Sequence, residues 1–143
     1  MYQPITAALP PVGSARETET LDFKARLNRL ADGSVDQVGV ALPVAAFANR
    51  VGGTLLYGAA EGADGTVIGY APLSPAEVAE TLNHCDMAIK ARCDPAPLWS
   101  HSVIQHATGS ALALNVEPYA GGFVAVRVPA DKAKGYGARV SRA

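Results

Sequence analysis

The sequence predicts one α+β domain: a mostly antiparallel mixed sheet with two main helices packed on it. Its 143 residues suit a single domain, and 49% apolar with 17% charged residues supply a core. Short alternating or apolar stretches separated by Gly and Pro turns indicate strands, and two longer apolar patterns indicate helices. Their order is strand, helix, hairpin, helix and a three-stranded meander, which is typical of an α+β fold.

The first strand and the first helix are predicted from side-chain spacing. In Thr18 to Lys24, Leu21 and Phe23 alternate with polar residues, as in a half-buried strand. Ser34 is expected to N-cap a helix beginning near residue 35. Pro43 either kinks this helix or moves the start of its regular part to about residue 42.

The middle of the chain predicts a hairpin followed by the second helix. Gly53 to Ala60 is a nearly continuous apolar run, typical of a central strand, and Thr66 to Tyr70 returns after a Gly-containing turn. Ser74, Pro75 and Glu77 form the signature of a capping box with proline at the first helical position. The last three strands of the predicted fold are Leu98 to His106, Ala111 to Val116 and Gly122 to Val128.

Other features limit the class of protein. The longest apolar run, about residues 38–48, contains Pro43 and is too short to span a membrane, and the first residues do not resemble a secretory signal. We therefore expect a cytoplasmic protein that does not insert in membranes. Cys85 and Cys93 are expected to be buried thiols. Residues 1–13 are predicted to be an irregular N-terminal arm and residues 14–143 the folded domain.

Charge is distributed unevenly along the chain. The net charge is −1, but residues 30–126 carry three basic groups against nine acids, whereas residues 127–142 carry five basic groups against Asp131 alone. Because binding to a phosphate backbone scales with the cations placed on it, a nucleic-acid surface on this protein has to be local. The two ends of the chain are where it could form.

Two sequence blocks resemble the Schlafen/AlbA-like nucleic-acid-binding family. The first is Glu17 followed by Leu21-Asp22-Phe23-Lys24, and the second runs from Ala46-Phe47-Ala48-Asn49 through Gly52-Gly53 to Gly58. The resemblance covers about residues 14–141. The chain departs from the family pattern in having Asp22 where Glu is usual. It also has a single acid, Glu61, in the turn after Gly58.

The resemblance implies two functions. The first, favoured because the departures thin the acid cluster, is a regulatory DNA- or RNA-binding domain without a cofactor. Its expected phosphate-contacting residues are Lys24, Arg26, Arg127, Lys132, Lys134, Arg139 and Arg142. The alternative is an endoribonuclease for tRNA- or rRNA-like substrates, dependent on Mg²⁺ or Mn²⁺. In that case Glu17, Asp22 and Glu61 would hold the metal and Lys24 would assist catalysis. A protein-interaction module, forming a homodimer or docking on a larger partner, is a third alternative.

These alternatives depend on geometry. Asp22 and Lys24 are two apart on a strand and therefore share a face. Glu17 joins them only if a bulge intervenes or the strand begins after it. Glu61 converges only if the first strand neighbours the one leading to Gly58. The basic C-terminal segment must also fold back beside Lys24 to make one groove.

Overall fold

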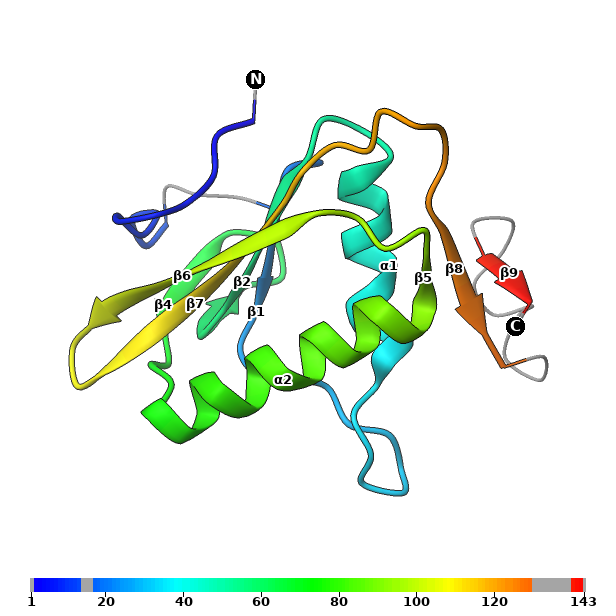
Figure 1. The fold of residues 1–143 in the computed structure, drawn as a ribbon. Helices are drawn as coiled ribbons and strands as arrows, with labels where there is room; N and C mark the ends of the chain where they lie inside the picture. The colour runs from blue at the N-terminus through cyan, green and yellow to red at the C-terminus, as the bar shows by residue number, and fades with distance from the viewer. Residues whose placement is uncertain (1, 14–16, 130–139, 143) are drawn as a thin grey trace.

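The computed structural model describes residues 2–13, 17–129 and 140–142, the last three by their backbone alone. The elements are β1 (Leu21–Lys24), α1 (Gln37–Ala48), β2 (Gly53–Tyr57), β3 (Ala59–Glu61), β4 (Val67–Tyr70), α2 (Pro75–Arg92), β5 (Cys93–Asp94), β6 (Trp99–His106), β7 (Gly109–Val116), β8 (Ala125–Val128) and β9 (Val140–Arg142) (Figure 1). The α+β fold predicted from the sequence is confirmed.

The central sheet has the strand order β1-β2-β7-β6. β1 runs parallel to β2, with Asp22 beside Leu55 and Lys24 beside Tyr57, and the other pairs are antiparallel. The first strand and the strand after the double glycine are therefore neighbours, as the convergence of Glu61 requires.

Each face of this sheet buries its own apolar core. On one face, Leu55, Tyr57 and Leu114 pack with buried residues of α1 and α2. On the other face, Phe23 and Leu56 pack with the β3–β4 hairpin and the N-terminal arm. Fully burying one such side chain contributes about 1.5–3 kcal/mol, so the second core, which contains Phe23, holds the edge strand β1 in place.

The described part of the N-terminal arm, residues 2–13, has no helix or strand but is tied to the sheet by the buried side chain of Asn115. The Oδ1 atom of Asn115 accepts hydrogen bonds from the Thr54 hydroxyl at 2.7 Å, the Ile5 amide at 3.1 Å and the Tyr2 hydroxyl at 3.2 Å. Its Nδ2 donates to the Ile5 carbonyl at 3.0 Å. Ile5 and Leu9 of the arm then cover the second core.

Helix α1 begins two residues later than the sequence predicts. The N-cap is Asp36, whose Oδ1 accepts from the Gly39 amide at 3.0 Å. Ser34 instead donates its hydroxyl to Asp32 at 2.6 Å within a turn, so the predicted Ser34 cap is wrong. The helix runs through Pro43 without starting anew at residue 42.

Helix α2 confirms the predicted capping box. The Ser74 hydroxyl accepts from the Glu77 amide at 3.1 Å, and the Glu77 carboxylate accepts from the Ser74 amide at 3.0 Å. The two cysteines are free and buried, as expected. Within the described ranges, no helix has the length and apolar character needed to cross a membrane.

The predicted three-stranded meander is wrong. β6 and β7 form a hairpin, but β8 pairs with β5 and β9 in a separate sheet. The linker after β7 crosses the end of α1, where the Tyr119 amide donates to the Ala48 carbonyl and the Asn49 side chain bonds both the amide and the carbonyl of Val124. β8 and β9 therefore lie on the opposite side of α1 from β1 (Figure 1).

Candidate functional site

Glu17 is placed by a turn that comes just before β1. Its amide donates to the Gly65 carbonyl in the β3–β4 turn at 2.7 Å, and Thr18 and Leu21 exchange backbone hydrogen bonds. β1 begins only at Leu21, so strict strand alternation does not separate Glu17 from Asp22. This is one of the two arrangements that the sequence required for the two carboxylates to meet.

Asp22 and Glu61 come from two neighbouring segments at the sheet edge. The Asp22 side chain is 19% exposed and lies 3.6 Å from the Lys24 ammonium. Gly58 has φ +91°, a left-handed conformation that costs glycine little, and it separates β2 from β3. The apolar run predicted as one strand, residues 53–60, is therefore two strands, and Glu61 ends the second.

The three carboxyl groups interact with one another. The pKa of Glu17 is raised to about 8, first because its side chain shares a hydrogen bond with Asp22, then because partial burial removes water and because Glu61 faces it. A hydrogen bond between two carboxyl groups requires a proton on one of them. The structure therefore brings together the three acids predicted from the sequence, and the hydrogen bond with Asp22, followed by partial burial and by Glu61, raises the pKa of Glu17.

We name Glu17, Asp22 and Glu61 the acid cluster. Its hard oxygen donors suit Mg²⁺ or Mn²⁺, and a cation would relieve the repulsion that raises the pKa of Glu17. As the side chains stand, however, no three Asp, Glu, His or Cys groups in the described parts of the chain form a ready set of metal ligands. The donor chemistry thus fits a divalent cation, and binding one would require the carboxylates to reorient.

The predicted phosphate-contacting residues lie in different places. Lys24 pairs with Asp22 in β1, whereas Arg127 pairs with Asp94 at 2.7 Å on β8 across α1. Lys132, Lys134 and Arg139 lie outside the described residues, and Arg142 is described only by its backbone in β9. Among the described residues, the predicted groove between Lys24 and the C-terminal strands is not formed, because α1 stands between them (Figure 1).

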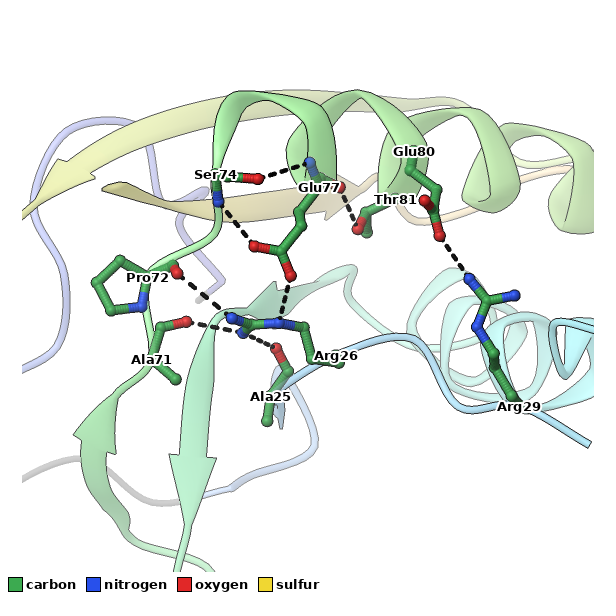
Figure 2. Close-up of polar contacts among 9 residues, drawn as sticks. All are labelled: Ala25, Arg26, Arg29, Ala71, Pro72, Ser74, Glu77, Glu80 and Thr81. Carbon is green, nitrogen blue, oxygen red and sulfur yellow. Dashed lines mark hydrogen bonds and ion pairs between the residues drawn. The ribbon is translucent and has the colours of Figure 1, made fainter. Parts of the chain in front are cut away.

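The guanidinium of Arg26 donates hydrogen bonds to other groups of the protein. Its Nε donates to Glu77 at 2.9 Å, one terminal nitrogen donates to the carbonyls of Ala25 and Ala71, and the other donates to the Pro72 carbonyl at 3.3 Å. Figure 2 shows this side chain pointing at the start of α2, where the Glu77 carboxylate also binds the Ser74 amide. Arg26 therefore joins the end of β1 to the β4–α2 connection.

Arg29 also donates hydrogen bonds to other groups of the protein. Arg29 donates to Glu80 at 2.5 Å (Figure 2). It also donates to the Gly33 carbonyl at 3.1 Å. Glu77 and Glu80 are three residues apart and so lie on one face of α2. Sequence reasoning missed these pairs, because nothing local to residues 25–29 indicates partners 51 positions away.

Two cavities flank the Arg26 side chain. One, of about 270 Å³, is lined by Lys24, Arg26, Asn28, Asp36, Gly39 and Tyr57. The other, of about 280 Å³, is lined by Arg26, Leu27, Arg29, Glu77, Glu80 and Thr81. Lys24 connects the first cavity to the acid cluster through its ion pair with Asp22.

Two solved structures are similar to this chain, and the first of them shares its fold. The N-terminal domain of a RecG-related protein from Nitrosomonas europaea, named for an ATP-dependent DNA helicase, has a TM-score of 0.50 and 20% identity over 71% of this chain and 65% of its own. The DIP2311 protein from Corynebacterium diphtheriae has a TM-score of 0.45 and 22% identity over 79% of this chain. This chain spans 20% of that protein's length.

The search of curated proteins found no match. The family described as Schlafen, AlbA_2 matches residues 17–139, a range that begins at the first acid of the cluster and includes the whole central sheet. The chain therefore belongs to the Schlafen AlbA_2 family.

Proposed function

We propose that this protein acts on nucleic acid and that the acid cluster is a divalent-metal-dependent site for cleaving phosphodiester bonds. Membership of the Schlafen AlbA_2 family supports a nucleic-acid-related role. The observation that carries the cleavage proposal is the convergence of Glu17, Asp22 and Glu61, which raises the pKa of Glu17 to about 8. Perturbed carboxyl groups gathered at an accessible edge are typical of functional sites.

The chain's own residues would have distinct tasks. Asp22 and Glu61 would hold Mg²⁺ or Mn²⁺, which supplies charge neutralisation at the phosphate and an activated water. Glu17 holds a proton at its carboxyl group in the absence of metal and would release it when a cation takes the place of that proton. Lys24, 39% exposed and beside Asp22, would orient a phosphate oxygen.

The test is an incubation with tRNA, single-stranded RNA, and single- and double-stranded DNA, in Mn²⁺, Mg²⁺ or EDTA. We expect cleavage that EDTA abolishes and that Asp22→Asn and Glu61→Gln each remove. Asp86→Asn is the matched control, because Asp86 is a surface carboxylate of α2 paired with Lys90. Cleavage that survives both cluster variants, or no cleavage of any substrate in either metal, would contradict the proposal.

Binding without cleavage is a second candidate. It is favoured by the lack, among the described side chains, of three acids already arranged around a cation position. In this case no cofactor is needed, and affinity should fall steeply with salt because phosphate contacts release counterions. Retention of labelled RNA or DNA in EDTA at about 50 mM salt tests it, and the lack of any retention at that salt concentration would exclude it.

A further inference from the structure

The segment between β1 and α1, residues 25–36, has a fixed shape. Within it, the Leu30 amide donates to the Ser34 carbonyl at 2.8 Å and the Asp36 amide donates to the Asn28 carbonyl at 2.9 Å. Its two arginines point at α2 and not away from the protein (Figure 2). We call residues 25–36 the connector.

Three cations at and along the connector each have a carboxylate partner, on β1 for Lys24 and on α2 for the two arginines. Lys24, just before it, pairs with Asp22, Arg26 with Glu77, and Arg29 with Glu80. The row of three cations begins at the acid cluster and leads away from it along the connector. Its charge is neutralised in the free protein, so composition and net charge do not reveal it.

Arg26 and Arg29 differ in how firmly they are held. Arg26 has four acceptors, three of them backbone carbonyls that do not move away independently. The Arg29 side chain is 47% exposed, and its carboxylate partner Glu80 is 52% exposed. Exposed ion pairs are weak, so Arg29 can exchange Glu80 for another anion. The guanidinium of Arg26 keeps its position and lines both cavities.

We propose that a single strand of nucleic acid lies along the connector, with phosphates at Lys24 and Arg29 and an unstacked base in each of the two cavities beside Arg26. This inference rests on the proposed action on nucleic acid and adds the strand's path and the single-stranded class of substrate. The two cavities, of about 270 and about 280 Å³, are the observation that favours a single strand over a duplex. A recess admits a splayed base, whereas a duplex keeps its bases stacked and presents its backbone.

Glu80 acts in this arrangement as a competing anion. A phosphate reaching Arg29 must replace the carboxylate, so the ion pair seen in the free protein lowers affinity. Removing Arg29 and removing the charge of Glu80 should therefore change binding in opposite directions. A purely structural role for the pair predicts that both changes act alike or not at all.

The test measures binding of fluorescent oligouridylate and oligothymidylate strands, and of a duplex of equal length, by anisotropy in EDTA across a salt series. Lys90→Ala and Asp86→Asn are the matched controls. Lys90 and Asp86 form an ion pair on α2, the helix that carries Glu80. Their substitutions change the net charge by the same amounts as Arg29→Ala and Glu80→Gln. Circular dichroism establishes that each variant is folded.

We expect Arg29→Ala to weaken single-strand binding and to reduce the slope of log K against log salt by about 0.7, the value for one phosphate contact on a single strand. Glu80→Gln should tighten binding about two- to fivefold, the range of a weak ion pair, and each control should match the wild type. Glu80→Gln keeps Arg29 and its bond to Gly33, so it tests the inference even if Arg29→Ala disturbs the connector.

The outcomes separate the two proposals. Equal effects of the connector variants and the controls, or a wild-type preference for duplex, would overturn the path while leaving cleavage at the acid cluster intact. Opposite effects of Arg29→Ala and Glu80→Gln without any metal-dependent cleavage would support the path and overturn the nuclease. A wild-type protein that binds no strand at low salt in EDTA would overturn the path, and one that also cleaves no substrate in Mn²⁺ or Mg²⁺ would overturn both.

Discussion

On the two flanks of β1, the pKa of a glutamate is shifted in opposite directions. Before the strand, Glu17 faces two other acids and the pKa of its carboxyl group rises to about 8. After the strand, the pKa of Glu77 is lowered, first by the Ser74 backbone amide and then by Arg26. The Ser74 amide and Arg26 compensate the charge of Glu77, so this is the neutralised flank. On the other flank Lys24 pairs with Asp22, and a bound cation would complete the acid cluster.

The largest expected effect is on cleavage. Asp22→Asn removes a carboxylate that the proposed site needs, and because even changes beyond the metal ligands cost 10–100-fold, we expect a loss of about 100-fold or more. Gel-based cleavage rates in Mn²⁺ measure it, with Glu80→Gln, on the neutralised flank, keeping at least the wild-type rate. Equal losses in the two variants would erase the distinction between the flanks.

The next effect concerns the stability of the neutralised flank. Arg26→Ala removes four hydrogen bonds, two of them to the Ala71 and Pro72 carbonyls of the β4–α2 connection, and we expect it to cost about 2 kcal/mol. Arg29→Ala breaks an exposed pair and should cost about 1 kcal/mol or less. Urea unfolding compares them, and Arg26→Lys should restore little, because an ammonium lacks the planar fork. An equal cost for both arginines would show that Arg26 does not join the elements.

A third expectation is stabilisation by metal at the acid cluster. Mn²⁺ at ten times its dissociation constant should raise the free energy of unfolding by about 1.4 kcal/mol. Thermal melts at pH 8 with and without Mn²⁺ measure this, and the gain should vanish in Asp22→Asn. A gain that persists in that variant would place the metal elsewhere.

The smallest effect is the pH dependence without metal. The pKa of Glu17 rises from 4.5 to about 8 on folding, so between these values the folded state binds more protons than the unfolded one and stability falls as pH increases. Because the group is largely accessible to solvent, we expect about 1 kcal/mol or less. Glu17→Gln should flatten this part of the melting profile, and an unchanged slope would mean that the carboxyl groups do not interact in solution.

Local signals predicted much of the fold. The capping box at Ser74 depends on residues within a few positions of each other and formed as expected. The hairpin around Gly65 formed only in part, because β3 alone pairs with β4 while β2, predicted as the same strand, lies in the central sheet. The misplaced N-cap of α1 is also local: Ser34 and Asp36 are both good caps, and Asp32 takes up the Ser34 hydroxyl. The meander failed because the Asn49 side chain binds Val124, 75 residues away, and redirects the chain across α1.

The acid cluster could be predicted in its membership but not in its geometry. Two motif blocks supplied Glu17, Asp22 and Glu61, while the turn that starts β1 at Leu21 and the break at Gly58 decide that they meet. Arg26 had no comparable signal, since Glu77 and the Ala71 and Pro72 carbonyls are distant in sequence. The hydrogen bonds of Asn115 did have a signal in the sequence, because a polar residue inside the apolar run Ala111 to Val116 needs hydrogen-bond partners when it is buried.

The anchoring of the arm bears on how the protein can be shortened. A version trimmed to the family match at residue 17 would lose Tyr2 and Ile5 and leave Asn115 with Thr54 alone of its four hydrogen-bond contacts to the arm and the sheet. It would also bare Phe23 and Leu56 to water, an uncovered sheet surface that invites self-association. Biochemical work on this chain therefore needs the arm intact, because insolubility of a trimmed version would say nothing about the chemistry of Glu17.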